Sequence, residues 1–531
     1  MQFNIADLLE CVVDTVPERT AVVCGDRRLS YAELDAQANR LAHHLLAQGI
    51  GSGDHVGMHL HNSVEYIVGM LATLKIRAVP ININYRYVEE ELKYLFDNAD
   101  LVAVIHQKSF SAVVSAAAAQ LPRLETFIHV EDGSEALKSH PSVDFEAALA
   151  AGKEERGFGP RSSDDQYIIY TGGTTGMPRG VMWRHEDLFF AGLQGGRPGG
   201  ESIERPEELA EVLREGGGLN IHPAAPLIHG AAQLASWICM FAGGTVGLVP
   251  GRSFDPESSC RLISDEEMNV INLVGDAMAR PFAEELDRGD YDTSMLVALS
   301  SAGAILSDVV KDLLEENLPD AMILNNYGSS ETGHQGTAIS RKGGQPRFFM
   351  HGDCTTVLDD EMKRVEAGSG VIGKLARTGN IPLGYYGDPE KTARTFPVVD
   401  GVRYVIPGDM ALLEEDGSVT LLGRGAVCIN TGGEKVYPEE VEEAFKSHPA
   451  VMDVVVVGIP DERWGERVTA LVELRQGVEA ELSSLEEHVR GKVAGYKTPR
   501  QIHVIPSVER HPSGKPDYRW ARETSIELCG G

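Results

Sequence analysis

The sequence predicts an α/β protein of more than one domain, with a large N-terminal body and a smaller C-terminal domain. The chain has 531 residues, and single hydrophobic cores stop growing well below that length. Segments with helical periodicity alternate with short apolar runs, which is typical of layered helices and strands. This alternation begins again after Arg424, so we expect the second domain there.

The first clear element is an amphipathic helix between Ser30 and Gly49. Ser30 and Glu33 have the spacing of a capping box, which satisfies free N–H groups at the start of a helix. Apolar residues then recur at helical spacing until Gly49, a residue type that commonly ends helices. The sequence therefore predicts one helix over this segment.

Two further apolar segments, 66–74 and 92–96, are each followed by a short apolar run, at 79–83 and 101–105. We expect the first of each pair to be a helix and the second a buried strand. This repeated order indicates a layered body in which strands lie beneath helices.

The stretch between Glu215 and Arg252 contains no Asp, Glu, Lys or Arg. Its length would fit a membrane span, but glycine, proline and histidine residues interrupt it. We therefore expect a buried helix followed by a buried strand. Segments 131–165 and 195–218 are rich in charged, glycine, serine and proline residues, and we expect both to be surface connections.

The C-terminal part of the chain repeats the α/β pattern. Pro438 stands at the start of an amphipathic helix, and residues 454–457 are predicted to form a buried strand. We expect an N-terminal domain over residues 1–425 and a compact C-terminal domain over residues 426–531.

Composition excludes several classes of partner. Lys and Arg number 48 against 79 Asp and Glu, and the net charge of -31 argues against broad contact with nucleic acid or an anionic membrane. The seven cysteines are scattered and typical of reduced cytosolic thiols. Acidic residues near the N-terminus argue against a signal peptide. We expect a cytoplasmic protein without a transmembrane segment, and a homodimer is left open.

The sharpest chemical signal is a glycine- and threonine-rich run that follows the apolar strand 167–170. Glycines let backbone N–H groups approach phosphate oxygens, and threonine hydroxyls add donors. Met177 and Pro178 stand where a Walker A loop would have Lys and Ser or Thr. A plain glycine-rich turn is the alternative, but the composition of the eleven residues from Tyr170 to Gly180 is more specific than that of such a turn. The expected phosphate loop comprises Thr171, Gly172, Gly173, Thr174, Thr175, Gly176 and Arg179.

This run resembles the loop of the adenylate-forming superfamily, which includes acyl-CoA synthetases, luciferases and the adenylation domains of peptide synthetases. Gly172 stands where the family usually has Ser, and Arg179 stands where it usually has Lys. Arginine keeps the positive charge, although it offers a fork of donors in place of a point charge. Further segments resemble the family's motifs, in the family's order, through nearly the whole chain.

The resemblance extends to the nucleotide-binding residues. The segment from Tyr327 to Thr332 resembles the one whose aromatic ring lies against adenine and whose glutamate, here Glu331, binds Mg²⁺. A flat ring suits a base, and a hard carboxylate suits Mg²⁺. Asp409 resembles the residue that accepts hydrogen bonds from the ribose. By resemblance, the ATP site comprises Gly303, Ala304, Tyr327, Gly328, Ser329, Ser330, Asp409, Arg424 and Lys515 beside the phosphate loop.

Three segments in the C-terminal part of the chain carry the remaining motifs. Gly432 and Gly433 resemble the loop that lines the pantetheine tunnel of coenzyme A, and Ala426 falls at the family's hinge. Lys515 resembles the catalytic lysine, whose ammonium stabilises developing negative charge. A lone lysine beside glycine is ordinarily a solvated surface charge, but the preceding motifs favour the catalytic assignment.

The resemblance also places an acyl pocket along segments 227–240, 272–282 and 300–306. Its expected lining is apolar and without a fixed charge, so it should accept a hydrophobic acid and exclude amino acids. A hydrogen-bonded core histidine is the alternative for the histidine in this set. The pocket residues are His229, Ile228, Trp237, Gly275, Met278 and Ala302.

By resemblance, the fold has a large N-terminal domain of packed α/β sheets plus a distorted β-barrel, and a small mobile α+β domain. The implied activity is an ATP-dependent acyl-CoA ligase with catalytic residues Lys515, Glu331 and Arg424 and with ATP, Mg²⁺ and coenzyme A as ligands. Motif variants resemble actinobacterial ligases for cholesterol side-chain acids, so a steroid acid is the first candidate and a medium- or long-chain fatty acid the second. Two other classes compete: a free-standing enzyme that loads a carrier protein, and a non-catalytic nucleotide-binding protein.

Overall fold

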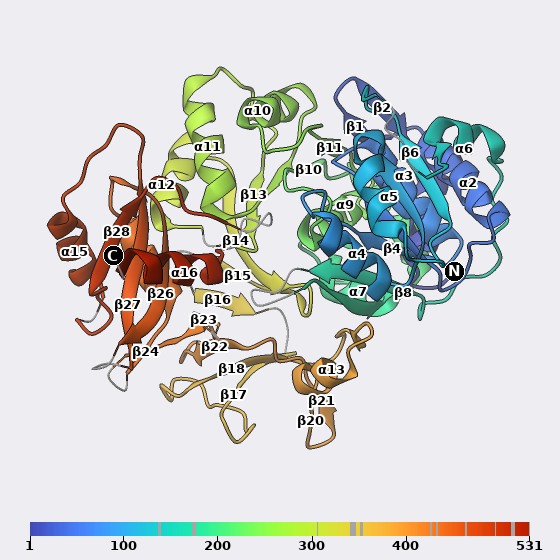
Figure 1. Cartoon of the computed structure of the whole chain (residues 1–531). Helices are drawn as coiled ribbons and strands as arrows, with labels where there is room; N and C mark the ends of the chain where they lie inside the picture. Colours follow the sequence, from blue (N-terminus) through green and yellow to red (C-terminus); the bar gives the residue numbers. More distant parts are fainter. Residues whose placement is uncertain are drawn as a thin grey trace.

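The structure is a computed structural model with a large N-terminal body and a smaller C-terminal unit, residues 427–529, packed against it (Figure 1). The residues that it describes are 1–135, 140–171, 177–304, 306–339, 347–350, 354–424, 427–431, 434–461, 465–493, 495–510 and 516–529.

The N-terminal body contains a sheet of eight strands in the order β19-β9-β8-β4-β3-β5-β6-β7. The strands from β8 to β7 in this order run parallel, whereas β9 pairs antiparallel with β8 and β19. Ligands of such sheets bind at the carboxyl ends of the strands. The bounds are β3 His55–His59, β4 Val79–Asn82, β5 Leu101–Gln107, β6 Thr126–Val130, β7 Val143–Asp144, β8 Gln166–Thr171, β9 Arg179–Arg184 and β19 Gly384–Tyr385.

A second sheet of thirteen strands crosses the body in the order β17-β18-β22-β23-β16-β15-β14-β13-β12-β10-β11-β1-β2. Strands β14 to β1 in this order are parallel, and β15 to β17 extend them as an antiparallel sheet. The bounds are β1 Thr20–Cys24, β2 Arg27–Ser30, β10 Ile221–Pro223, β11 Val246–Leu248, β12 Val270–Leu273, β13 Ala298–Ala302, β14 Met322–Ser329, β15 Gly333–Ile339, β16 Arg347–Met350, β17 Thr355–Leu358, β18 Ile372–Arg377, β22 Asp409–Leu413 and β23 Val419–Arg424.

The sequence resemblance implied a distorted barrel in the N-terminal domain without assigning it to particular strands, and the antiparallel part of this sheet is the region to compare with it. Within the described residues its pairing order is open and ends at β17. A separate pair of short strands, β20 Val398–Val399 and β21 Val402–Arg403, lies beyond it.

Helices cover both sheets of the body (Figure 1). They are α1 Ile5–Thr15, α2 Tyr31–Ala47, α3 Val64–Lys75, α4 Glu89–Asn98, α5 Ser111–Ala118, α6 Phe145–Ala151, α7 His185–Gly192, α8 Leu209–Glu215, α9 Gly230–Phe241, α10 Pro256–Asp265, α11 Gly275–Arg288, α12 Asp308–Asn317 and α13 Pro389–Thr395. No helix in the described ranges is both long enough and apolar enough to span a bilayer.

Most helices and strands expected from periodicity are confirmed. In α2, Ser30 Oγ accepts from Glu33 N at 3.2 Å and Glu33 Oε2 accepts from Ser30 N at 2.8 Å, which makes the predicted capping box. The uncharged stretch contains α9 and then β11, as expected. The two predicted surface connections are wrong in part, because α6 and α8 lie within them. Each of these two helices buries a few apolar side chains, although its surroundings in the sequence are polar.

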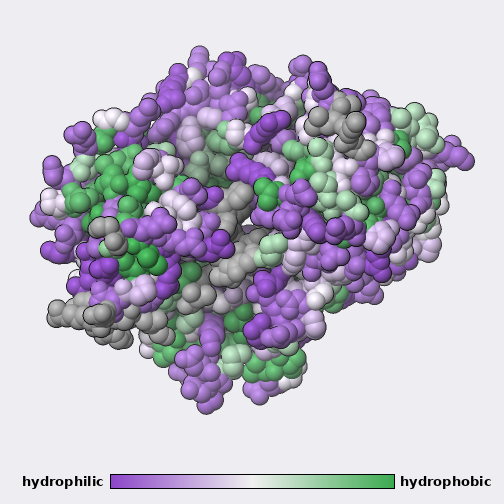
Figure 2. Space-filling view, in the orientation of Figure 1, coloured by the Kyte–Doolittle hydropathy of each residue, from purple (hydrophilic) through white to green (hydrophobic). Residues whose placement is uncertain are grey.

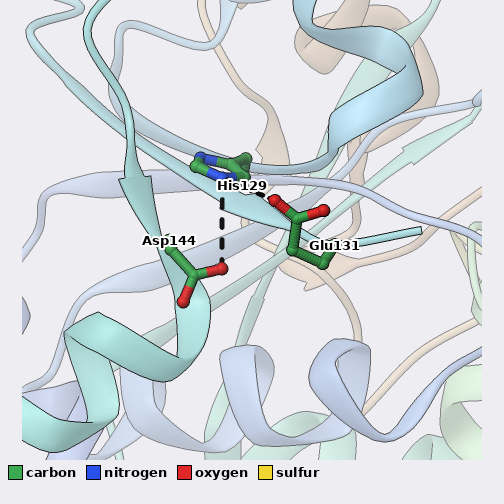
Figure 3. Close-up of side chains that lie close together, drawn as sticks. All are labelled: His129, Glu131 and Asp144. Carbon is green, nitrogen blue, oxygen red and sulfur yellow. Dashed lines mark ion pairs between the residues drawn. The ribbon is translucent and has the colours of Figure 1, made fainter. Parts of the chain in front are cut away.

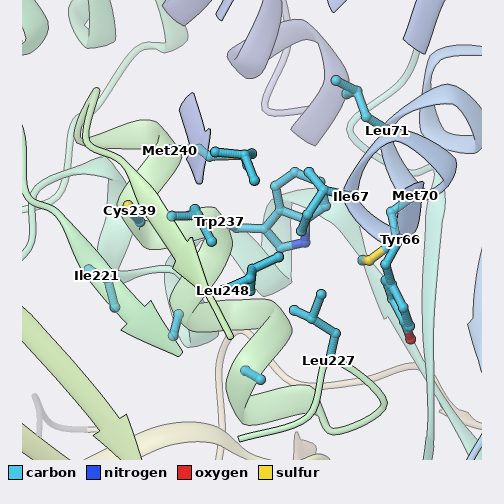
Figure 4. Close-up of a cluster of buried hydrophobic side chains, with 14 of the residues drawn as sticks. Tyr66, Ile67, Met70, Leu71, Ile221, Leu227, Trp237, Cys239, Met240 and Leu248 are labelled. Carbon is cyan, nitrogen blue, oxygen red and sulfur yellow. The ribbon is translucent and has the colours of Figure 1, made fainter. Parts of the chain in front are cut away.

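The core of the body lies between α3 and α9, where every residue of α3 is buried. Trp237 and Met240 of α9 and neighbouring residues pack against α3 and β11 (Figure 4). Buried polar groups are paired there: Trp237 Nε1 donates to Tyr167 Oη at 3.1 Å, and this hydroxyl donates to Gln233 Oε1 at 2.7 Å.

The C-terminal unit has a five-stranded sheet, with β28 parallel to β27 and the other pairs antiparallel. The expected helix from Pro438 and the expected strand over 454–457 are confirmed as α14 and β26. On the face seen in Figure 2, hydrophobic side chains gather over this unit, where Val504, Ile526 and Leu528 are exposed. The bounds are β24 Ile429–Thr431, β25 Glu434–Val436, α14 Pro438–Lys446, β26 Val451–Asp461, β27 Gly465–Leu474, α15 Leu482–Arg490, β28 Gln501–Ile505 and α16 Tyr518–Cys529.

Candidate active site

A cavity of about 230 Å³ lies between the large sheet and the C-terminal unit. One wall comes from the carboxyl ends of β13 and β14 and from β22 and β23, and the other comes from α14 and the segment before α16. Its lining includes the predicted nucleotide residues Gly303, Ala304, Tyr327, Gly328, Ser329 and Asp409. The cavity therefore gathers residues that are far apart in the sequence.

Two predicted nucleotide residues are in direct contact in this cavity. Tyr327 Oη donates a hydrogen bond to Asp409 Oδ2 at 2.8 Å. Phe348 packs edge-on against the Tyr327 ring, with ring centroids 5.6 Å apart. The contact places an aromatic surface for a base beside a carboxylate that can accept from ribose hydroxyls.

The backbone around Tyr327 leaves no space for larger residues. A Cβ at Gly328 would lie 2.2 Å from the carbonyl oxygen of Gly333, so glycine is required for β14 and β15 to approach this closely. Arg424 ends β23 opposite Asp409 in the β22–β23 ladder, which brings its backbone to the same wall. The side chain of Arg424 lies outside the described residues.

Two asparagines in the lining were not among the residues predicted from the sequence. Asn325 and Asn326 precede Tyr327 on β14, and both line the cavity. Asn326 is held in place, because its Nδ2 donates to Ser300 Oγ at 2.8 Å and its Oδ1 accepts from Thr337 Oγ1 at 2.7 Å. Polar residues at the carboxyl end of a parallel strand were the available signal.

Glu331 lies in the turn between β14 and β15, next to strands β9 and β19 of the eight-stranded sheet. Tyr385 Oη of β19 donates to Glu331 Oε1 at 2.9 Å. Trp183 Nε1 of β9 donates to the carbonyl oxygen of Ser330 at 2.9 Å. These bonds hold a partly exposed carboxylate beside the hairpin that carries the phosphate loop, and an oxygen ligand of this kind fits Mg²⁺.

Residues 172–176 of the predicted phosphate loop lie outside the described residues, but both of its ends are positioned. Thr171 at the end of β8 pairs with Arg179 at the start of β9. Arg179 Nε lies 3.2 Å from Asp388 Oδ2. Lys391 of α13, a second cation that was not predicted, lies near this pair.

The predicted C-terminal residues Lys515, Ala426, Gly432 and Gly433 also lie outside the described residues. The two ends of the segment that carries Lys515 are described, because Arg510 and Pro516 form an isolated antiparallel bridge. Both residues line the cavity. Arg510 is held by Asp453, whose carboxylate oxygens each lie 2.6 Å from its guanidinium nitrogens.

The predicted acyl-pocket residues other than Trp237 lie at or near the ends of α9, α11 and β13. His229 is the N-cap residue of α9, and the carbonyl oxygen of the buried Ile228 accepts from Asn82 Nδ2 at 2.6 Å. Gly275 N, at the start of α11, donates to Ser301 Oγ at 3.0 Å. Met278 lies one turn further along α11. Ala302 ends β13, beside Gly303 and Ala304 of the cavity lining.

Trp237, like the acyl-pocket residues above, is not among the residues that line the cavity. Its side chain is 1% exposed and packs in the core between α9 and α3 (Figure 4). The resemblance indicated a pocket position, but the indole lies about two helical turns beyond His229, on the side of α9 that faces Tyr167. The structure therefore gives Trp237 a packing role.

His185, which resembles no motif, is also structural. Its Nδ1 accepts from Ile5 N at 3.2 Å, and complete burial lowers the pKa of its imidazole to about 4. The ring therefore stays neutral and joins the N-terminal helix to α7.

A cluster of His129, Glu131 and Asp144 lies at the carboxyl edge of β6 and β7, away from the cavity (Figure 3). His129 Nε2 is 3.5 Å from Glu131 Oε1 and 4.0 Å from Asp144 Oδ2. Lys108 Nζ already binds both oxygens of Glu131, at 2.8 and 2.9 Å. We interpret this cluster as an ion-pair network that joins neighbouring strands.

Two family models match the chain. The model described as AMP-binding enzyme matches residues 9–386, and the model described as AMP-binding enzyme C-terminal domain matches residues 440–515. The first match alone covers more than half of the chain, and the second ends at Lys515.

Individual proteins are similar over almost the full length. A "Medium/long-chain-fatty-acid--CoA/3-oxocholest-4-en-26-oate--CoA ligase" from Mycobacterium tuberculosis is 48% identical, over 98% of this chain and 96% of the relative. A "3-oxocholest-4-en-26-oate--CoA ligase" from Rhodococcus rhodochrous is also 48% identical, with the same coverage of 98% and 96%. The crystal structure of ATP-bound MatB from Rhodopseudomonas palustris superposes with a TM-score of 0.82 at 26% identity, over 99% of this chain and 100% of that one.

These matches agree with the geometry, since Tyr327, Asp409 and the Arg510 flank of the Lys515 segment, which come from both matched regions and the chain between them, surround one cavity. We conclude that this chain belongs to the family of AMP-binding enzymes.

Proposed function

We propose that the protein is an AMP-forming acyl-CoA ligase, which converts a hydrophobic carboxylic acid, ATP and coenzyme A to acyl-CoA, AMP and diphosphate. The contact between Tyr327 and Asp409, on a cavity that the flanks of the Lys515 segment also line, is the observation that carries this proposal. The names of the relatives at 48% identity support it.

In the first half-reaction, an oxygen of the acid forms a bond to the α-phosphorus of ATP. The bond from this phosphorus to the bridging oxygen breaks, and diphosphate leaves with the electron pair. The Tyr327 ring stacks on adenine and Asp409 accepts from the ribose, which fixes the α-phosphate relative to the acid. To the Lys515 ammonium and to Arg424 we assign the stabilisation of the charge on the carboxylate and α-phosphate oxygens. Glu331 would hold Mg²⁺, which neutralises charge on the phosphates when bound.

In the second half-reaction, the thiol of coenzyme A attacks the carbonyl carbon of the acyl-adenylate. A carbon–sulfur bond forms, the carbon–oxygen bond to AMP breaks, and the thiol proton is released. We assign the path of the thiol to the loop at Gly432 and Gly433.

We place the division between the domains at residues 425 and 426, with Ala426 as the hinge. Ion pairs join the C-terminal unit to α11: Lys446 Nζ lies 3.8 Å from Asp276 Oδ2, and Arg475 Nη1 lies 3.4 Å from Glu284 Oε1.

For the acid we propose a steroid side-chain carboxylate first and a medium- or long-chain fatty acid second. Met278, Ala302 and Ile228 supply apolar or small side chains in the segments that the resemblance assigns to the acyl pocket, and an ammonium group would find no partner among them. We further propose a cytoplasmic location, which the seven free cysteines support.

The substrate class is tested by specificity constants for a steroid acid, a series of C8 to C16 fatty acids and an aryl acid, each with coenzyme A. We expect the steroid acid to have the highest kcat/KM. A preference for plain fatty acids by about a hundredfold, roughly 2.7 kcal/mol of transition-state binding, would contradict the steroid assignment. Product formation with a carrier protein but not with coenzyme A would contradict the proposed acceptor.

Replacing Glu331 with Gln should slow adenylation and raise the Mg²⁺ concentration needed for half-maximal rate, because a charged oxygen ligand becomes neutral. Glutamine can still accept the hydrogen bond from Tyr385, so the fold should be retained. A magnesium titration of the adenylation rate measures this, with Glu390→Gln on the exposed side of α13 as the control. An unchanged titration would show that Glu331 only supports the turn.

A further inference from the structure

The phosphate side of the site contains a cation that belongs to none of the family-like motifs. Asp388 is the N-cap residue of α13 and accepts from the backbone nitrogen of Lys391 at 2.9 Å. The same carboxylate pairs with Arg179 Nε at 3.2 Å. One acidic residue therefore holds the end of the phosphate loop and the start of α13 together.

The Lys391 side chain extends from this anchor toward Glu331. Its Nζ lies 5.4 Å from the centroid of the Tyr385 ring, whose hydroxyl donates to Glu331 Oε1 at 2.9 Å. The pKa of Lys391 is lowered overall, because burial and the neighbouring Arg179 outweigh the opposite effect of Glu331 and Asp388. The two cations and the predicted Mg²⁺ ligand thus lie close enough to sense one another.

The charges around this point favour an anionic ligand. Among the described residues, Lys391 has no carboxylate oxygen within 4.0 Å of its ammonium, and Arg179 shares its single carboxylate partner with the backbone of α13. Asp388 and Glu331 offset part of the repulsion between these two cations, and a bound anion would offset more of it. The cavity at Tyr327 and Asp409 is lined on the α14 side by Glu439, Glu440, Glu442 and Glu443, which would repel a polyphosphate.

We propose that Lys391, together with Arg179, binds the β- and γ-phosphates of ATP and the diphosphate that leaves them. This inference rests on the proposed function. When the bond between the α-phosphorus and the bridging oxygen breaks, the electron pair moves onto diphosphate, and the Lys391 ammonium lies where this negative charge develops. A compact ammonium on a flexible stem can follow the leaving group, whereas the Arg179 fork is fixed by Asp388.

The test compares three variants by their binding of two probes, inorganic diphosphate and AMP, measured by titration calorimetry at constant ionic strength. Lys391→Met removes the charge and keeps the length of the side chain, and Lys391→Arg keeps the charge. Arg394→Met is the matched control, because Arg394 lies on the same helix, is 71% exposed and, within the described part of the chain, pairs with Glu390 alone. The diphosphate KM in acid-dependent ATP–diphosphate exchange is measured for the same proteins.

We expect Lys391→Met to weaken diphosphate binding about tenfold, the lower end of the range for a charged hydrogen bond, and to leave AMP binding unchanged. Lys391→Arg should retain most of the diphosphate affinity, and Arg394→Met should match the wild type. Equal losses for AMP and diphosphate, or a loss for diphosphate below twofold, would overturn the inference. A wild-type enzyme without acid-dependent exchange would contradict the proposed function instead, and the calorimetry would still decide the role of Lys391.

Discussion

Replacing Lys515 with Ala is expected to lower the rate of acyl-adenylate formation by about a hundredfold to a thousandfold, the usual effect of removing one preorganised group that stabilises developing charge. Thioester formation from acyl-adenylate that is supplied ready-made should be largely spared, because the thiol attacks a carbonyl carbon that is already activated. The two rates are measured separately, by acid-dependent diphosphate release and by acyl-CoA formation from synthetic acyl-AMP.

The control is Arg519→Ala, which removes another cation close in sequence. Arg519 is 83% exposed on α16 and lies 3.5 Å from Glu523, so neither rate should change. An equal loss of both half-reactions in Lys515→Ala would contradict a role confined to adenylation, and normal adenylation would remove Lys515 from the active site.

The second large effect is expected on stability, at a buried ion cluster in the N-terminal body. Lys75 is fully buried at the end of α3, with Nζ 2.5 Å from Glu10 Oε1 and 2.7 Å from Asp35 Oδ1. Lys75→Met keeps the volume of the side chain but leaves two carboxylates without this cation. We expect the free energy of unfolding to fall by about 3–5 kcal/mol at neutral pH.

The pH dependence of this loss is a sharper test than its size. Burial raises the pKa of Glu10, but the hydrogen bond from Arg161 and the charges of Lys75 and Arg161 outweigh burial and lower it below 4.5. A carboxyl group with a lowered pKa stabilises the fold above its ordinary pKa, and this contribution is lost as the pH falls through the folded-state value. The difference between wild type and Lys75→Met should therefore shrink below about pH 4.5.

Urea unfolding at several pH values measures both effects. The control is Arg261→Met, which removes an exposed partner of Glu257 at 2.7 Å and should change the free energy of unfolding by less than about 0.5 kcal/mol. A constant difference between wild type and Lys75→Met as the pH falls from 7 to well below 4.5 would show that lost packing, and not lost charge pairing, is responsible.

Local patterns predicted much of the fold, and the reason lies in short-range chemistry. The capping box of Ser30 and Glu33, and the apolar spacing that follows it, specify α2 without help from the rest of the chain. The helices α6 and α8 were missed because each buries only a few side chains, such as Phe145 and Leu209, against distant elements.

The candidate site could be predicted residue by residue from motifs, but not as an arrangement. Tyr327 and Asp409 meet although 82 positions separate them, and Tyr385 reaches Glu331 across 54 positions. Sheet pairing decides such contacts, and motif spacing does not encode it. Lys391 belongs to no motif, so the sequence did not single it out. The core packing of Trp237 could not be predicted, because an apolar residue on α9 can face either the pocket or the core. The homodimer, which the sequence left open, stays open.

Mass spectrometry of one incubation in two steps tests whether the reaction passes through an acyl-adenylate. The enzyme is mixed with ATP, Mg²⁺ and a hydrophobic acid, and coenzyme A is added only after the first sample is taken. We expect acyl-AMP and diphosphate in the first sample, and acyl-CoA and AMP at the expense of acyl-AMP in the second. Formation of ADP and phosphate, or of acyl-CoA without any acyl-AMP or diphosphate, would contradict the acyl-adenylate mechanism.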